Sequence, residues 1–196
     1  MNLELLTVNE HSSAKYPPRT AYNAKSAGTT LALAVNLNTA GEKLTKKLAE
    51  ERYIGFELKD DSNSIDIARA LYRKMKNDNS NTLNIAGNGI YTLSEHGCSQ
   101  QFINQFIYEI VAQVHHFLPI AKIYTGGQTG ADIAGAVAGF ALGIPTEVTL
   151  PNGFKQRFED NIDIDGTREK VIAQIEEGAK ALPVFQVVTK KNHKPG

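Results

Sequence analysis

Short apolar runs alternate with amphipathic segments along most of the chain. Five of these runs are rich in apolar and β-branched residues and are bounded by Gly, Asn or Pro, as strands are; they span residues 30–36, 53–58, 82–87, 122–126 and 145–150. Between them, apolar residues recur three or four positions apart, which is the spacing of one helix face. Leu44 and Leu48 are one example, and the series Ile67, Leu71 and Met75 is another.

The alternation predicts the fold class. Residues 100–118 repeat apolar side chains at helical spacing, and residues 131–143 are small and apolar almost all round. Strands joined by crossover helices form a mainly parallel sheet with helices on both faces. We therefore predict a single doubly wound α/β domain over residues 1–188, followed by a flexible polar tail at 189–196.

Composition narrows the class of partner. Lys and Arg number 21 and Asp and Glu also number 21, so the charge balance predicts no binding to duplex nucleic acid or to a membrane. The single cysteine, Cys98, excludes an internal disulfide framework and fits a reducing compartment. Since no long apolar run or basic leader is present, we expect a soluble, cytoplasmic protein.

The stretch TGGQTGAD, residues 125–132, leaves one predicted strand and enters the next helix. In an open α/β sheet, ligands bind outside the carboxyl ends of the strands, where helix N-termini offer free amides to anions. Glycines would let the backbone approach a phosphate closely, although such turns can also be purely structural. The ligand-binding candidates in this turn are Gly126, Gly127, Gln128, Thr129, Gly130 and Asp132.

Other polar turns follow the same layout. A glycine-rich turn leaves the predicted strand at 82–87, and we expect it to face TGGQTGAD across a topological switch point, where the two would form one cleft. A polar segment at 16–30 precedes the first predicted strand, and a further strand-to-helix turn lies at 36–45. The ligand-binding candidates in these turns are Arg19, Thr20, Asn23, Thr39, Gly41, Gly87, Asn88 and Gly89.

Charged residues give the remaining candidates. Arg157 and Lys155 could clamp a phosphate, Arg157 better because its fork pairs two oxygens, or they could lie on a solvated loop. Asp132 could bind a ribose hydroxyl, act as a general base, or only stabilise the helix dipole. If the protein is an enzyme, the working residues would be Asp132, Arg157 and Glu159.

No metal or cofactor is expected. His115 and His116 are adjacent near the end of a predicted helix and have no Cys or acidic partners at metal-ligand spacing. Tyr22 and Tyr91 stand beside polar turns and could stack on a purine.

The motifs together resemble a known family. GGQTGAD, followed by LGIP and LPNGFKQRFED, is similar to the pattern of the molybdenum carrier family. The upstream stretch RTAYNAKSAGTTLALAVNLNTAGEKLTKKLA and the motif LNIAG resemble the same family, so that the likeness covers about residues 16–165. GGQTG comes first in that family and after LNIAG here, so the chain resembles a circular permutation of it, which is feasible where termini lie close together.

The resemblance implies a Rossmann-like nucleotide-binding fold of the SLOG superfamily, which also includes the LOG phosphoribohydrolases. The acidic residue of the LOG turn is missing here, and Asp132 stands nearer the helix start. The first hypothesis is a binding module that captures a nucleotide-derived anion, such as an ADP-ribose derivative or a cyclic nucleotide, as phage counter-defence sponges do. The alternatives are a LOG-like nucleotide hydrolase and a molybdenum cofactor carrier.

We favour binding, because the sequence is rich in glycine-lined turns and poor in closely spaced nucleophile–base pairs. The expected partner is a small nucleotide-like ligand. The apolar helix 100–118 could also join copies of the chain in a homo-oligomer.

Overall fold

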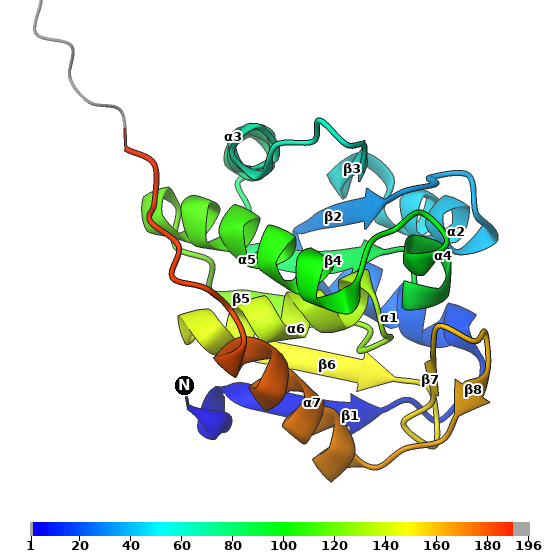
Figure 1. Cartoon of the computed structure of the whole chain (residues 1–196). Helices are drawn as coiled ribbons and strands as arrows, with labels where there is room; N and C mark the ends of the chain where they lie inside the picture. Colours follow the sequence, from blue (N-terminus) through cyan, green and yellow to red (C-terminus); the bar gives the residue numbers. More distant parts are fainter. Residues whose placement is uncertain (1, 190–196) are drawn as a thin grey trace, which may run out of the picture.

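The computed structural model describes residues 2–189 and contains a six-stranded sheet (Figure 1). Neighbouring strands are all parallel, in the order β1-β6-β5-β4-β2-β3. The strands are β1 (Leu6–Glu10), β2 (Thr29–Ala34), β3 (Tyr53–Glu57), β4 (Thr82–Gly87), β5 (Lys122–Thr125) and β6 (Thr146–Leu150). The predicted parallel sheet is confirmed. Residues 190–196 of the predicted tail lie outside the described residues.

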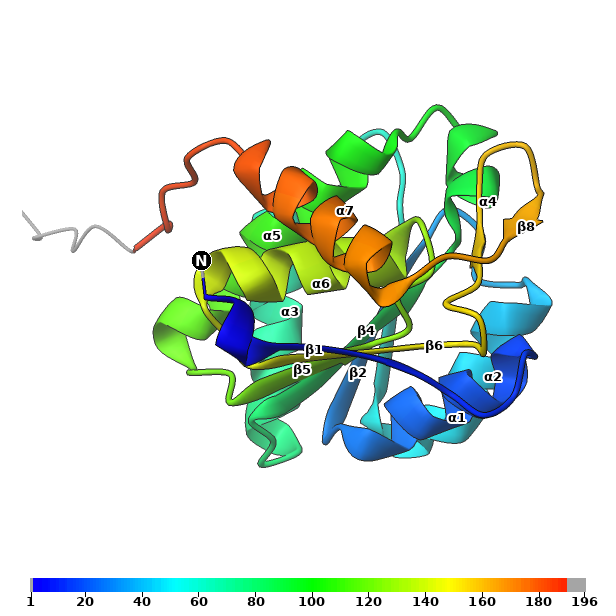
Figure 2. The same ribbon diagram turned by 90° about the horizontal axis from the view of Figure 1, so that it is seen from below.

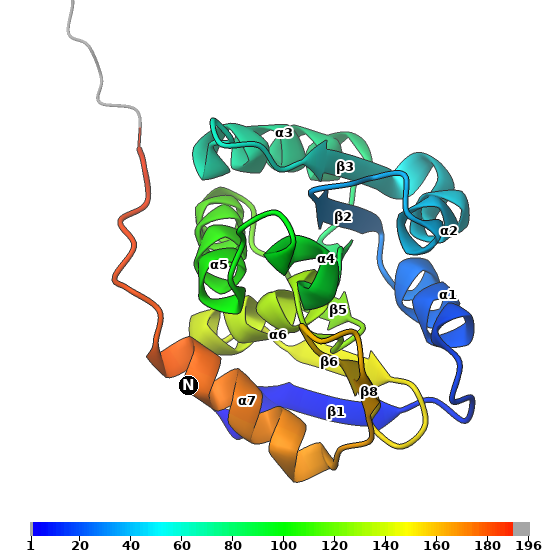
Figure 3. The ribbon, with the colours of Figure 1, turned by 45° about the vertical axis from the view of Figure 1, so that its right-hand side comes forward.

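Helices cover both faces of the sheet (Figures 2 and 3). One face carries α1 (Tyr16–Ser26) and α2 (Ala40–Ala49), which contact each other. The opposite face carries α3 (Ser64–Asn77), α5 (Gln100–Phe117), α6 (Ala131–Leu142) and α7 (Arg168–Lys180), which pack in that order. The smaller elements are the 3-10 turns η1 (Leu3–Leu5) and η2 (Glu50–Arg52), helix α4 (Ile90–Ser94) and the antiparallel pair β7 (Gln156–Arg157) and β8 (Asp163–Ile164). This is a doubly wound, Rossmann-like α/β fold.

Two elements at the start of the chain were not predicted. β1 lies at the edge of the sheet beside β6, and α1 occupies the segment that we expected to be a polar entry to the first strand. Pro17 and Pro18 suggest a helix break, yet they stand in the first turn of α1, where a missing amide costs no hydrogen bond. The predicted alternation of strands and helices is therefore right from β2 to β6, while β1 and α1 before it and β7, β8 and α7 after it were not predicted.

The core explains the unusual composition of α6. This helix is buried along almost its whole length, with α5 on one side and α7 on the other. Gly135 lies against Ile85 of β4 and Gly139 against Thr146 of β6, so that the helix backbone comes close to the sheet. Residues 131–143 are small and apolar all round because every side of the helix meets protein.

The connections place a switch point between β2 and β4. From β2 the chain crosses to β3 on one side, and from β4 it crosses to β5 on the other. We had predicted that the turns at 87–89 and 126–130 face each other across the switch point. They instead follow the neighbouring strands β4 and β5, on one side of it. They are joined directly, since the Ile90 amide donates to the Thr129 carbonyl (3.2 Å) and the Ala131 amide donates to the Asn88 carbonyl (3.1 Å). The turn that faces 87–89 across the switch point is the one between β2 and α2.

A pair of glycines tests the packing beneath the predicted ligand turn. Gly127 and Gly143 have nearly the same positive φ, 67° and 68°. A Cβ on Gly127 would lie 2.6 Å from Val148 Cγ1, whereas one on Gly143 would meet nothing within 4 Å. We expect Gly143→Ala to cost about 1–2 kcal/mol of unfolding free energy from the positive φ, and Gly127→Ala to cost a further ~1–3 kcal/mol from overpacking.

Urea unfolding of the two variants measures this difference. Equal losses for Gly127→Ala and Gly143→Ala would contradict the close contact beneath the turn. The same contact means that a large side chain at position 127 would disturb the core rather than block a ligand.

Candidate functional site

A cleft of about 490 Å³ opens at the carboxyl edge of the sheet, over the switch point. Its walls come from α1, from the start of α2 and from the turns that follow β4 and β5. Most of the predicted site residues line it: Arg19, Thr20, Asn23, Thr39, Gly41, Gly87, Asn88, Gly89, Gly126, Gln128, Asp132 and Arg157. The structure thus brings together residues from segments that are far apart in the sequence.

Three of the six ligand-binding candidates in the TGGQTGAD turn lie outside this lining. Gly127 faces the core, against Val148 and Leu150. The Thr129 hydroxyl donates to the carbonyl of Arg157. Gly130, with φ of 96°, packs against the backbone of the turn after β4. These residues shape the turn and do not point into the cleft.

Three of the seven amides from Gly126 to Asp132 are bonded within the protein. The Gly130 amide donates to Gln100 Oε1 (2.6 Å), the Ala131 amide to the Asn88 carbonyl, and the Gln128 amide to the Asp132 carboxylate. These three groups are therefore unavailable to an anion. These bonds make TGGQTGAD a structural brace between β5, α6 and the neighbouring turn, and its role as a phosphate cradle stays a prediction.

Asn88 also has a structural role. Its Oδ1 accepts from the Asn36 amide (3.0 Å) and its Nδ2 donates to the Asn36 carbonyl (3.2 Å). This pair of bonds links the turn after β4 to the turn after β2 at the switch point. Gly87 has no space for a side chain, because a Cβ would lie 1.9 Å from the Leu33 carbonyl oxygen. The bottom of the cleft is consequently rigid.

The start of α2 is the open edge of the cleft. The Thr39 hydroxyl caps the helix by accepting from the Glu42 amide (3.3 Å). Ala40 and Gly41 line the cleft, and within the described chain their amides have no acceptor. A Cβ on Gly41 would meet nothing within 4 Å. Free amides at the positive end of a helix dipole favour an anion at this edge.

An ion pair between Arg19 of α1 and Asp132 of α6 crosses the carboxyl edge of the sheet. Arg19 Nη1 lies 2.5 Å from Asp132 Oδ2, and the two side chains are only 11% and 6% exposed. A Cβ on Gly126 would lie 1.5 Å from Arg19 Nη1, so the glycine makes room for this pair. Burial raises the pKa of the Asp132 carboxyl, and Arg19 and the Gln128 amide oppose that rise.

Glu42 is a site residue that sequence reasoning missed. It lines the cleft, is 3% exposed, and its Oε2 has no hydrogen-bond partner in the part of the chain that the structure describes. The sequence Thr-Ala-Gly-Glu from Thr39 has the form of a capping box, in which the acid would accept from the cap amide. Only the Thr39 half of that box is formed. Burial and, to a smaller extent, the nearby Asp132 charge raise the Glu42 pKa to about 7, against the opposing effect of Arg19.

Unpartnered polar atoms are concentrated in this cleft. Asn23 is 2% exposed, and neither its Nδ2 nor its Oδ1 has a partner in the described chain. With Arg19 Nε and Glu42 Oε2, four of the five such buried atoms among residues 2–189 belong to side chains that line the cleft. Since buried polar groups in native proteins are normally hydrogen-bonded, this concentration makes the cleft the candidate functional site.

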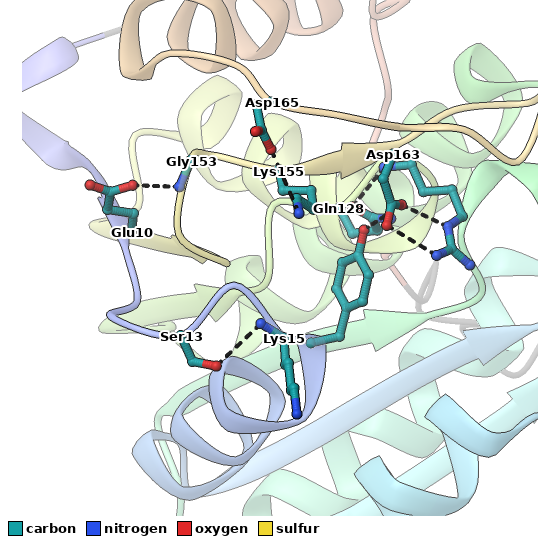
Figure 4. A network of polar contacts seen from close by, with 10 residues as sticks. Glu10, Ser13, Lys15, Gln128, Gly153, Lys155, Asp163 and Asp165 are labelled. Carbon is teal, nitrogen blue, oxygen red and sulfur yellow. Dashed lines mark hydrogen bonds and ion pairs between the residues drawn. The ribbon is translucent and has the colours of Figure 1, made fainter.

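The predicted phosphate clamp is already paired. Arg157 lines the cleft, but its Nε and Nη2 donate to the Asp163 carboxylate at 2.8 and 3.2 Å. Tyr16 also donates to Asp163 (2.8 Å), and burial together with that bond raises the Tyr16 pKa to about 12. Lys155 lies outside the lining and points to Asp165, at 3.8 Å (Figure 4). Arg157 would have to release Asp163 before its Nε–Nη2 fork could bind a phosphate, whereas Lys155 is only loosely paired.

The other candidates are scattered. Glu159 does not line the cleft but a separate hollow beside Thr129, so the set Asp132, Arg157 and Glu159 does not assemble in one place. Tyr91 lines the cleft, whereas Tyr22 donates to Glu147 elsewhere. Among residues 2–189, no group of three or more His, Cys, Asp or Glu could hold a metal ion, and no helix has the length and apolar character needed to cross a bilayer.

No protein-family model, curated protein or solved structure matches this chain. The resemblance to the SLOG superfamily therefore stays a prediction.

Glu42 predicts a specific dependence of stability on pH. Its folded pKa of about 7 lies above its ordinary value of 4.5, so the folded state binds the proton more tightly. Stability should therefore fall as the pH rises from 4.5 to 7, because ionisation is opposed only in the folded state. The full effect is about 3 kcal/mol, and Glu42→Gln should remove it.

Urea unfolding at pH 5 and pH 8 compares the native chain with Glu42→Gln. The variant should gain stability relative to the native chain as the pH rises. A constant difference between the two proteins across this range would show that Glu42 is not held in a desolvated site.

Proposed function

We propose that the protein binds a nucleotide-derived, phosphate-bearing small molecule in the cleft at the switch point and holds it without cleaving it. An ADP-ribose derivative and a cyclic nucleotide are the leading candidates. One observation carries the proposal: an open helix N-terminus and four unpartnered buried polar atoms share a single cleft. The helix end suits a phosphate, and the buried atoms suit the polar groups of a sugar or base.

The size and place of the cleft support this proposal. Its volume of about 490 Å³ falls within the range of roughly 300–1,000 Å³ that is typical of small-molecule sites. In open α/β sheets, ligands bind outside the carboxyl ends of the strands at the switch point. Tyr91 on one wall offers an aromatic face to a base.

We propose further that capture is the biological role, as in phage proteins that sequester an immune signal. The support is the resemblance of TGGQTGAD and its companion motifs to the SLOG superfamily. A molybdenum cofactor, which carries a phosphate on a pterin, would suit the same cleft chemically.

A second candidate is a nucleotide hydrolase, and Glu42 favours it. A buried carboxyl with a pKa near 7 is suited to proton transfer at neutral pH. Asp132 is close enough to raise that pKa, and Arg19 is close enough to lower it. In such an enzyme Glu42 would have the catalytic role that we predicted for Glu159.

Ligand recovery separates the two candidates. The protein is incubated with ADP-ribose isomers and cyclic dinucleotides, separated from free ligand, denatured, and the released compounds are identified by mass spectrometry. We expect one compound to be returned intact in near-stoichiometric amount. Release of a free nucleobase or a new phosphate product would instead establish the hydrolase.

Gly41 offers a test of the phosphate position. Gly41→Asp should preserve folding, because the position is open and an acid is favourable in the first helical turn. Its charge would repel a phosphate at the α2 amides, so we expect binding of the recovered compound to weaken at least tenfold. Gly41→Asn is the matched neutral control and should bind within about threefold of the native chain. Equal binding by both variants would place the phosphate elsewhere.

A further inference from the structure

The cleft contains two chemically different regions. The start of α2 presents amide donors alone, at Ala40 and Gly41. The second region, here called the buried polar cluster, contains two carboxyl groups and an amide besides its guanidinium; its members are Arg19, Asn23, Glu42 and Asp132. A phosphate fits the first region and would be repelled by the carboxylates of the second. The buried polar cluster therefore faces another part of the ligand.

The free atoms of the buried polar cluster are balanced between donors and acceptors. Glu42 Oε2 and Asn23 Oδ1 are two free acceptor atoms, and Asn23 Nδ2 and Arg19 Nε are two free donor atoms. A hydroxyl both donates and accepts. Two neighbouring hydroxyls can thus satisfy all four atoms, since each gives one hydrogen bond and receives another.

We propose that the buried polar cluster is the subsite for the vicinal diol of a ribose, so that the ligand is a ribosyl phosphate or ribonucleotide with both hydroxyls free. This inference rests on the proposed function and specifies its sugar. A phosphate could use the free donors but not the free acceptors. A metal ion at the Asp132 carboxylate would lie beside the Arg19 guanidinium, whose Nη1 is 2.5 Å from Asp132 Oδ2. The positive charge of Arg19 would repel such a second cation.

The fold holds the cluster in position without a ligand. Arg19 and Asn23 stand four residues apart on α1 and therefore share one face of that helix. The ion pair to Asp132 fixes the Arg19 guanidinium, which leaves Nε as its free atom in the buried polar cluster. Glu42 extends from the first turn of α2, which packs on α1.

The two regions are also adjacent. Gly41, at the open helix edge, directly precedes Glu42, in the buried polar cluster. A ribose 5-phosphate likewise carries an anion and a diol on one small ring. The loss of one hydroxyl would leave at least one buried atom unpaired, which is costly in a site shaped for that group. We expect the preference for ribose over 2-deoxyribose to be at least tenfold.

NMR-monitored titrations test this preference. Ribose 5-phosphate, 2-deoxyribose 5-phosphate and inorganic phosphate are added to the native chain, and AMP is compared with 2′-deoxy-AMP in the same way. Ribose forms should bind at least tenfold more tightly than their deoxy forms. Glu42→Gln should reduce that preference to less than threefold, because one acceptor is replaced by an amide. Glu159→Gln, which changes a carboxylate outside the cleft, should retain it.

The outcomes separate this inference from the proposed function. Equal binding of ribose and deoxyribose forms, or an unchanged preference in Glu42→Gln, would overturn the diol subsite and leave ligand binding intact. Binding of a 3′,5′-linked cyclic dinucleotide in place of these compounds would also overturn the diol subsite and leave ligand binding intact, since that ligand lacks a vicinal diol. Failure of every sugar phosphate and nucleotide to bind would overturn both.

Discussion

The account depends on the free-energy cost of burying polar atoms without hydrogen bonds. A folded protein normally pairs such atoms, and each exception is unfavourable by about 1–3 kcal/mol. Here Asn23 and Glu42 are almost fully buried and keep three unpartnered atoms at the same cleft. The rest of the fold is well satisfied around them: Asn88 bonds to Asn36, and the amides of Gly130 and Ala131 have protein acceptors. The unpaired atoms are therefore the basis for proposing that this cleft binds a ligand.

The glycine-rich turn has a structural role besides the one its sequence suggests. GGQTG has the composition of a phosphate loop, yet three of its neighbouring amides are bonded within the protein. Its glycines serve close packing: Gly126 leaves space for Arg19 and Asp132, and Gly127 leaves space for Val148. The turn contributes to the site indirectly, because it positions the ion pair that closes one wall. The start of α2 adds free amides at the open edge of the cleft.

Much of the architecture could be predicted from the sequence, because parallel strands and crossover helices leave strong periodic patterns. The strand 82–87 has the predicted bounds, and most predicted cleft residues do line the cleft, since carboxyl ends of parallel strands meet at one edge. Helix α1 was missed because Pro17 and Pro18 mimic a break. Glu42 was missed because the sequence Thr-Ala-Gly-Glu is typical of a helix cap. Only the tertiary packing of α1 on α2 shows that the Glu42 carboxyl is buried with an unpartnered oxygen. Ion pairing of Arg157 with Asp163 is likewise invisible in the sequence.

The central claim is that the unpartnered atoms of the cleft form hydrogen bonds with the polar groups of a bound ligand. A crystal structure of the protein with AMP tests it most directly. The account predicts the phosphate within hydrogen-bond distance of the Gly41 amide and the two ribose hydroxyls on Asn23 and Glu42. A complex with AMP bound away from this cleft, or one in which Asn23 and Glu42 are paired by the protein's own side chains, would contradict it.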